Sequence, residues 1–78
     1  MFYVYVLRNP RGILYKGSTG DLPGRIEEHN WGILKKYTKN KGPWQLVYFE
    51  QFTTRAAAMR KERFFKTGKG REYLKTKL

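Results

Sequence analysis

The chain has 78 residues and carries 17 Lys and Arg side chains against six Asp and Glu, which gives a formal net charge of +11. This length suits one domain, expected to span residues 1–78, and a sequence with no cysteine and one histidine excludes disulfide bridges and a zinc staple. The charge excess favours a polyanionic partner, above all nucleic acid, while the absence of a secretory signal and of any apolar run of about 20 residues predicts a cytoplasmic protein without a membrane contact.

The N-terminal residues predict a β-hairpin. Phe2–Leu7 is β-branched and aromatic throughout, and Ile13–Gly17 is a second run of strand-forming residues. Asn9–Gly12 between them supplies a turn, because proline presets φ and glycine tolerates a positive φ. Tyr5 and Tyr15 lie side by side in one pairing register, but a slip of one residue places them on opposite faces. The sequence alone leaves this register open.

A helix is predicted over Leu22–Lys35, with Asp21 as its N-cap. One stripe of this helix combines two apolar and two basic side chains at helical spacing, namely Leu22, Arg25, Ile26 and His29. The stripe should face the sheet, so its polar members need partners. A phosphate suits Arg25, because a guanidinium forks onto it with two hydrogen bonds. An oriented structural histidine is the alternative for His29.

The remaining elements complete an α+β fold. A basic loop is expected at Lys36–Gly42, a third strand at Gln45–Phe52, a helix at Arg55–Lys66 capped by Thr53 or Thr54 and ended by Thr67–Gly70, and a short basic helix at Arg71–Leu78. The order is β-β-α-β-α-α. Since no helix connects the first two strands, we expect a three-stranded, mostly antiparallel sheet flanked by helices.

Glu62 stands out among the basic residues of the second helix. It shares a helical stripe with Ala58 and Phe65, which indicates that it faces inward. One inward carboxylate is enough to hold a Mg²⁺ ion, which keeps most of its water shell and binds through one or two carboxylates and substrate phosphate. An ordinary salt bridge to a neighbouring Lys or Arg is the alternative.

Taken in order, these residues resemble the signature of the GIY-YIG nucleases. The resemblance runs through Tyr3–Tyr5 (YVY), Tyr15–Gly17 (YKG), Arg25 and His29 four residues apart, and Glu62 in a downstream helix. It covers nearly the whole chain and is greatest to the small stand-alone bacterial members of the family. The chain departs from the motifs at Tyr3, Val4 and Lys16, where the family has glycine, isoleucine and isoleucine.

The resemblance implies a metal-dependent endonuclease that hydrolyses phosphodiester bonds in DNA, in repair or recombination, with one Mg²⁺ or Mn²⁺ ion. The implied roles are general base or water positioning for Tyr5, contact with the nucleophile or a phosphate oxygen for Tyr15, charge stabilisation for Arg25, orientation or proton relay for His29, and metal binding for Glu62. A catalytic set of this kind must converge on one site.

Backbone contacts are expected from basic residues near the site, namely Lys16, Lys36, Lys39 and Lys41. Contacts to phosphate carry no base information, so low sequence specificity follows. The expected partner is DNA, with RNA left open, and the expected state is a monomer or a weak homodimer.

Two other functions account for the charge. One is a basic nucleic-acid-binding module that keeps the fold without catalysis. The other is an interaction protein whose basic face docks an acidic protein or a lipid surface. Neither explains why the two tyrosines, the arginine, the histidine and the glutamate occur together.

Overall fold

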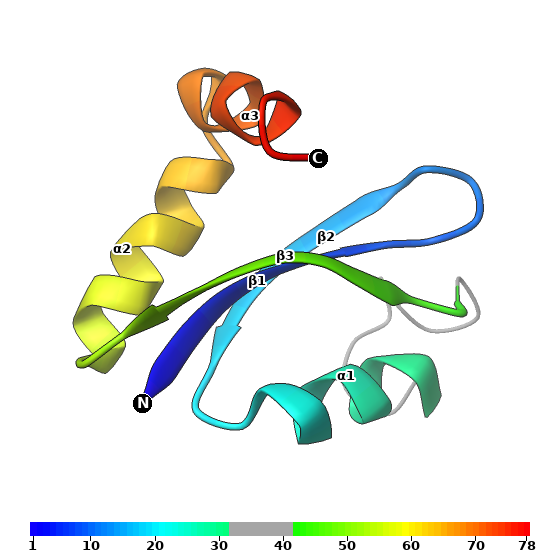
Figure 1. The fold of residues 1–78 in the computed structure, drawn as a ribbon, viewed down its shortest axis with the longest axis horizontal. Helices are drawn as coiled ribbons and strands as arrows, with labels where there is room; N and C mark the ends of the chain where they lie inside the picture. Colours follow the sequence, from blue (N-terminus) through cyan, green and yellow to red (C-terminus); the bar gives the residue numbers. More distant parts are fainter. Residues whose placement is uncertain (32–41) are drawn as a thin grey trace.

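The computed structural model describes residues 1–31 and 42–78, which form three strands and three helices in the predicted order. The elements are β1 (Phe2–Arg8), β2 (Leu14–Thr19), α1 (Leu22–Trp31), β3 (Gln45–Phe52), α2 (Arg55–Phe65) and α3 (Gly68–Lys75). Figure 1 shows α1 below the strands, α2 to their left and α3 above them.

The sheet has the strand order β2-β1-β3, and β1 pairs antiparallel with both neighbours. The predicted fold class is therefore confirmed. The β1–β2 turn is closed by the Asn9 side chain, whose Oδ1 accepts from the backbone N–H groups of Arg11 (3.0 Å) and Ile13 (2.8 Å). Gly12 has a φ of 81°, which favours glycine. This turn sets the register of the hairpin.

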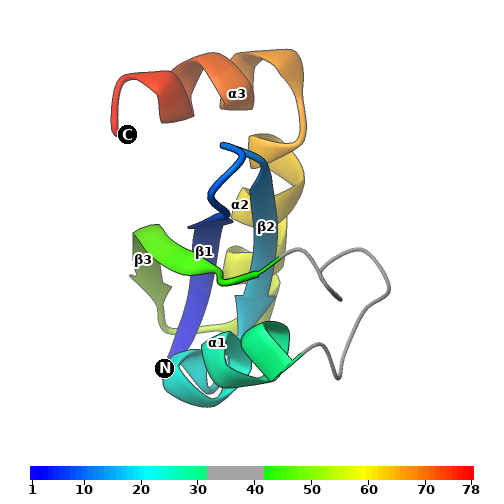
Figure 2. The same cartoon turned by 90° about the vertical axis from the view of Figure 1, so that its right-hand side faces the viewer.

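Strand alternation divides the core into two clusters, one on each face of the sheet. Val4 and Val6 pack against Phe65 of α2 and Leu74 of α3. Tyr5 and Leu7, on the other face, pack against Leu22 of α1 and Trp44. Figure 2 shows the resulting arrangement, in which the strands lie between α1 and α2. The helices hence approach β2 from both faces.

Two element boundaries differ from prediction. The strand pattern was expected to end at Gly17, but β2 continues through Ser18 and Thr19 because both pair with β1. Thr67–Gly70 was expected only to end α2, yet α3 already begins at Gly68, with Thr67 as its N-cap. The prediction was wrong because Gly68 and Gly70 were expected to break the helix. Gly70 instead packs closely against the end of α2, where a larger residue would not fit.

Other predictions hold where the structure describes the chain. Asp21 accepts a hydrogen bond from the backbone N–H of Gly24, and Thr54 caps α2. The predicted C-terminal part of the first helix, 32–35, lies outside the described residues, as does almost all of the basic loop. In the described part of the chain, no helix is long and apolar enough to cross a membrane.

Candidate active site

Tyr5 and Tyr15 lie on the same face of the hairpin. Tyr5 is paired with Gly17 and Tyr15 with Leu7, so the two tyrosines are diagonal neighbours with ring centroids 6.3 Å apart. This is the register that the sequence left open. A Cβ atom added to Gly17 would lie 2.6 Å from the Tyr5 hydroxyl oxygen, so only glycine leaves room for the phenol to cross β2.

His29 joins the two tyrosines from α1. Its Nε2 lies 2.8 Å from the Tyr5 hydroxyl oxygen, and its ring centroid is 4.6 Å from that of Tyr15. Both Tyr5 and His29 are 1% exposed. Because neutral imidazole has one acceptor nitrogen, Tyr5 donates to Nε2 when the ring proton is on Nδ1. The predicted stripe of α1 therefore faces the sheet, and its histidine has the polar partner that burial requires.

Arg25 lies at the rim of this site. Its side chain is 35% exposed and forms an ion pair with Glu28 of the same helix at 3.4 Å. Burial raises the pKa of the Tyr5 phenol above its ordinary value of 10.0, and Tyr15 and Glu62 raise it further, while the guanidinium of Arg25 opposes them. Tyr5 is thus a neutral phenol at neutral pH, and Arg25 is the group that favours its ionised form.

Glu62 approaches from α2 on the other face of the sheet. Its Oε1 accepts from the Ser18 hydroxyl at 2.7 Å, and its Oε2 accepts from the Lys66 ammonium at 2.9 Å. The Glu62 side chain is 23% exposed. The predicted inward stripe is confirmed, since Ala58 and Phe65 are buried. Glu62 is held against the edge strand and still reaches solvent.

The tyrosines with His29 and Arg25 lie on the α1 side of the sheet, and Glu62 lies on the α2 side. The two groups meet around β2, which is an edge strand. Burial raises the pKa of Tyr15, and Glu62 acts in the same direction, whereas Lys66 and Arg25 lower it. Charges from both α1 and α2 therefore reach this phenol. All five predicted catalytic residues converge at one edge of the sheet.

The residues present fit a single divalent cation bound at Glu62. In residues 1–31 and 42–78, no group of three or more His, Asp and Glu side chains is placed to share an ion. Mg²⁺ needs no such group when water and substrate phosphate supply the other ligands. Each Glu62 oxygen accepts one hydrogen bond in the structure, and a carboxylate oxygen has a second lone pair to offer.

The predicted backbone-binding lysines fall in two groups. Lys16 lies opposite Val6 on the face of the sheet that α2 and α3 cover. Lys36, Lys39 and Lys41 lie outside the described residues. The salt bridge to a neighbouring basic residue, which was the alternative for Glu62, is present and is made with Lys66. Sequence reasoning missed Ser18, the other partner of Glu62. The i, i+4 spacing of Glu62 and Lys66 was a usable signal, but the contact with Ser18 links residues 44 apart.

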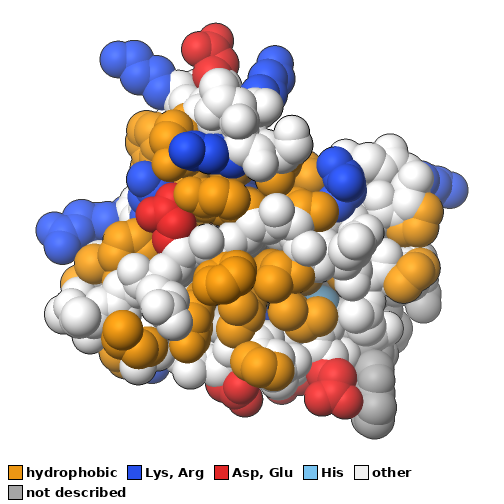
Figure 3. All heavy atoms as spheres, viewed as in Figure 1, with side chains coloured by type: hydrophobic (Ala, Val, Ile, Leu, Met, Phe, Trp, Pro, Cys, Tyr) orange, Lys and Arg blue, Asp and Glu red, His pale blue; other side chains and the backbone are white. Residues whose placement is uncertain are grey.

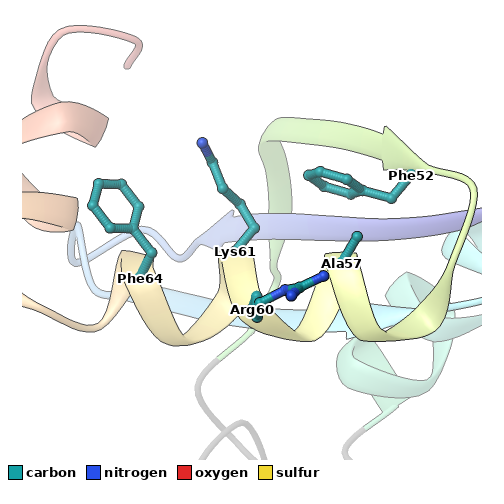
Figure 4. Close-up of a pocket in the computed structure, with 5 residues that line it drawn as sticks. All are labelled: Phe52, Ala57, Arg60, Lys61 and Phe64. Carbon is teal, nitrogen blue, oxygen red and sulfur yellow. The ribbon is translucent and has the colours of Figure 1, made fainter.

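A separate groove of about 390 Å³ lies on another flank of α2, lined by Phe52, Ala57, Arg60, Lys61 and Phe64 (Figure 4). None of the predicted site residues lines it. Arg60 and Glu62 are two positions apart on a helix of 3.6 residues per turn, so they point to nearly opposite sides of α2. The groove and the tyrosine site are consequently distinct.

Comparison with known proteins places this arrangement in a family. Residues 1–75 match the GIY-YIG catalytic domain. The chain belongs to the GIY-YIG family. Tyr5 and Tyr15 are then the tyrosines of its two name-giving motifs, and Gly17, which leaves room for Tyr5, is the glycine of the second. The resemblance read from the sequence is confirmed.

The GIY-YIG relatives are small proteins. A UPF0213 protein of Pediococcus pentosaceus is 49% identical over 65 residues, which are 83% of this chain and 68% of the relative. A UPF0213 protein of Staphylococcus saprophyticus is 41% identical over 73 residues, which are 94% of this chain and 89% of the relative. The solution NMR structure of a UPF0213 protein from Bacillus halodurans is 37% identical, with a TM-score of 0.58, and the match covers 97% of this chain and 84% of that one.

Proposed function

We propose that this GIY-YIG protein is a divalent-metal-dependent endonuclease that hydrolyses phosphodiester bonds in DNA with low sequence specificity. The observation that carries the proposal is the convergence of two phenols, an imidazole, a guanidinium and a carboxylate at the edge of β2. An acid–base pair, a charge stabiliser and an ion ligand are the parts that phosphodiester hydrolysis requires. The net charge of +11 accounts for attraction of the polyanion.

The Tyr5–His29 pair is suited to remove a proton from the attacking water. With Tyr5 neutral at the start, its hydroxyl takes the proton of the water as its own proton passes to His29 Nε2 at 2.8 Å. The water oxygen then bonds to phosphorus, and the bond from phosphorus to the leaving oxygen breaks. Solvent returns a proton to that oxygen. In this scheme His29 is the final proton acceptor, which explains why a buried phenol with a raised pKa can serve.

Arg25 and Tyr15 are the residues placed to hold the phosphate. Arg25 is partly exposed, and its ion pair with Glu28 is of the surface kind that contributes only about 0–1 kcal/mol. A phosphate can therefore displace Glu28 at little cost and gain a bidentate contact. The Tyr15 hydroxyl, beside His29 and nearer to solvent than Tyr5, would donate to a phosphate oxygen or to the nucleophile.

Glu62 would hold the Mg²⁺ or Mn²⁺ ion. A bound divalent ion supplies Lewis-acid polarisation of the phosphate and stabilises the leaving oxygen. The contribution of the chain is to keep the carboxylate fixed, and the Ser18 hydroxyl and the Lys66 ammonium both do so in the structure. Lys66 occupies the position of a counter-ion that the metal would replace.

Nicking of supercoiled plasmid tests the proposal. The wild type should convert plasmid to the nicked form with Mg²⁺ or Mn²⁺ and leave it intact with EDTA. Glu62→Gln and Tyr5→Phe should each lower the rate by about 100-fold or more, the size expected for loss of an ion ligand or a general base. Matched controls are Glu27→Gln, an exposed carboxylate of α1, and Tyr3→Phe, two residues from Tyr5 on the same strand.

The outcomes separate the candidate functions. Loss of nicking in both site variants, with both controls active, would support the nuclease. A folded wild type that binds plasmid but leaves it uncut under all metal conditions would instead favour the non-catalytic binding module, for which the basic composition is sufficient. A parallel reaction on single-stranded RNA decides whether DNA is the preferred substrate.

A further inference from the structure

Three cations converge beside Glu62, where β2 meets the junction of α2 and α3. Lys16 projects from β2 toward the helices, Lys66 follows the last residue of α2, and Arg71 lies in the first turns of α3. Burial lowers the pKa of the Lys16 ammonium, and Arg71 and Lys66 lower it further. The geometry agrees, because Lys16 lies on the same face of β2 as Ser18, and Glu62 contacts both Ser18 and Lys66. The Arg71 backbone is bonded to Thr67, the residue after Lys66.

The cluster has a surplus of positive charge. Lys66 is paired with Glu62 at 2.9 Å. Within the described ranges, no carboxylate lies within ion-pair distance of Lys16 or Arg71. Holding like charges together without matching acids costs free energy, and an anion bound among them would recover it. The arrangement is therefore more favourable with an anionic ligand than without one.

The junction of the two helices holds this cluster in place. A Cβ atom on Gly70 would lie 1.8 Å from the carbonyl oxygen of Phe64, so the start of α3 is in backbone contact with the end of α2. The Thr67 hydroxyl accepts from the Gly70 N–H at 3.1 Å, and the Arg71 N–H donates to the Thr67 carbonyl at 3.0 Å. Arg71 is thereby fixed one residue after a buried, tightly packed glycine.

We propose that Lys16, Lys66 and Arg71 form a subsite for a second phosphate of the cleaved strand, adjacent to the phosphate under attack. This inference rests on the proposed function. Phosphates recur about every 3.4 Å of axis along each strand, so a strand positioned at Glu62 must place a neighbouring phosphate close by. Lys66 would contact this second phosphate once the metal ion has taken its place at Glu62.

The subsite would fix the direction in which a DNA strand binds. It lies on the side of Glu62 that faces α3, whereas Arg25 lies on the side that faces α1. If the second phosphate of a DNA strand binds only on the α3 side, the strand can bind in only one 5′-to-3′ direction. This holds even though the protein makes no contact with the bases. Lys16 is central to this, because it stands where the GIY-YIG motif has an isoleucine, a side chain that cannot bind phosphate.

The first experiment measures binding alone. A fluorescent DNA duplex of arbitrary sequence is titrated in EDTA at several salt concentrations with the wild type, Lys16→Gln, Arg71→Gln and Arg60→Gln. Arg60→Gln removes the same charge as Arg71→Gln, but from the side of α2 that points away from Glu62. Lys16→Gln and Arg71→Gln should each weaken binding by about fivefold or more and lower the salt slope by about one, as expected for a lost phosphate contact. Arg60→Gln should change affinity by less than about twofold.

The second experiment locates the contact. A duplex with one uncharged methylphosphonate linkage is nicked with Mg²⁺, and the nick positions around that linkage are mapped. The wild type should avoid the modified linkage and, in addition, one neighbouring linkage on one side only. Arg71→Gln should lose this one-sided protection while still avoiding the modified linkage, a change that a loss of stability would not produce.

The two arms separate the subsite from the nuclease proposal. Equal binding by Arg71→Gln and Arg60→Gln would overturn the subsite, whether or not the plasmid is nicked. A symmetric nicking gap in the wild type would overturn it as well. A third outcome is that Lys16→Gln and Arg71→Gln selectively weaken DNA binding while neither the wild type nor any variant nicks DNA. This outcome would support the phosphate site and overturn the nuclease proposal.

Discussion

The position of the Tyr5 ring depends on a single hydrogen atom at Gly17. In Gly17→Ala the new methyl group would meet the hydroxyl oxygen and its ring carbon at 2.6 and 2.7 Å. The phenol must then leave its present position, in which it contacts His29. We expect a loss of about 1–3 kcal/mol in the free energy of unfolding, as for other overpacked interiors, and a parallel fall in nicking. Urea denaturation and the plasmid reaction measure the two effects.

Gly20→Ala is the matched control, because its nearest neighbour, the Phe2 ring, lies at an ordinary 3.5 Å. It should change stability by no more than about 0.5 kcal/mol, as usual for a substitution without a specific clash. If both alanine variants lose the same stability, the effect does not come from the contact with Tyr5 and the role given to Gly17 is wrong.

The Tyr5 phenol should make stability depend on alkaline pH. Burial, Tyr15 and Glu62 raise its folded pKa above the ordinary 10.0. The folded state therefore holds its proton at a pH where the unfolded state releases it, so stability is present below about pH 10 and lost as the pH rises beyond it. The fall between about pH 9 and about pH 11 should be smaller for Tyr5→Phe than for the wild type, because the variant lacks this proton. Urea midpoints at the two pH values test this, and equal falls would contradict it.

The residues of the candidate site were predictable as a set, but their contacts were not. Tyr5, Tyr15 and His29 were predicted from the resemblance to the GIY-YIG signature, while the register that brings the tyrosines together depends on the turn closed by Asn9. The contact between Ser18 and Glu62 joins two elements that meet only after β2 and α2 have packed. Local patterns carry no information about such a distant pairing.

At the scale of elements, the junction between α2 and α3 depends on Gly70. In Gly70→Ala the methyl group would collide with the Phe64 carbonyl, a backbone atom that cannot move without displacing α2. We expect a loss of more than about 2 kcal/mol, at the upper end of the range for core overpacking. Separation of α3 would expose Leu74 and Phe65, so binding of a hydrophobic dye should rise with the loss of stability.

Gly68→Ala tests whether this effect is local. Gly68 belongs to the same helix, but an added Cβ would meet nothing within 4 Å. Alanine there should be neutral or stabilise the protein by up to about 1 kcal/mol, because glycine is the poorer helix former. A loss equal to that of Gly70→Ala would show that α3 rejects alanine for some other reason than contact with α2.

The elements with strong local patterns were predicted well, and α3 shows where such patterns fail. β1, β3 and α2 have long runs of strand-forming or helix-forming residues, and their predicted ends lie within about one residue of the observed ones. In Thr67–Gly70, two glycines indicated a break. There the packing of Gly70 on Phe64 and the Thr67 cap outweigh the low helix propensity of glycine.

Over the whole molecule, charge is unevenly spread. Residues 55–78 contain nine of the 17 Lys and Arg side chains and two of the six acidic ones. Figure 3 shows acidic side chains at the lower edge, where α1 lies in the same view, and also at the left of the centre and at the top over α3, while basic side chains predominate around α2, α3 and the hairpin. A strand that enters the site is therefore attracted mainly from the α2–α3 side, which agrees with a second phosphate contact at Arg71.

Such a charge distribution predicts tight, salt-sensitive and sequence-independent DNA binding. Several phosphate contacts release a corresponding number of counter-ions, so affinity for any duplex should fall steeply, by about 10³-fold or more between roughly 50 and 200 mM salt if at least six contacts form. Fluorescence titrations with two duplexes of unrelated sequence measure this, and their affinities should agree within about threefold at each salt concentration. Nick positions mapped on a plasmid should likewise be widely spread. Cleavage at one short sequence would show that base edges are read, and the reading residues would then have to be sought beyond the phosphate-binding groups described above.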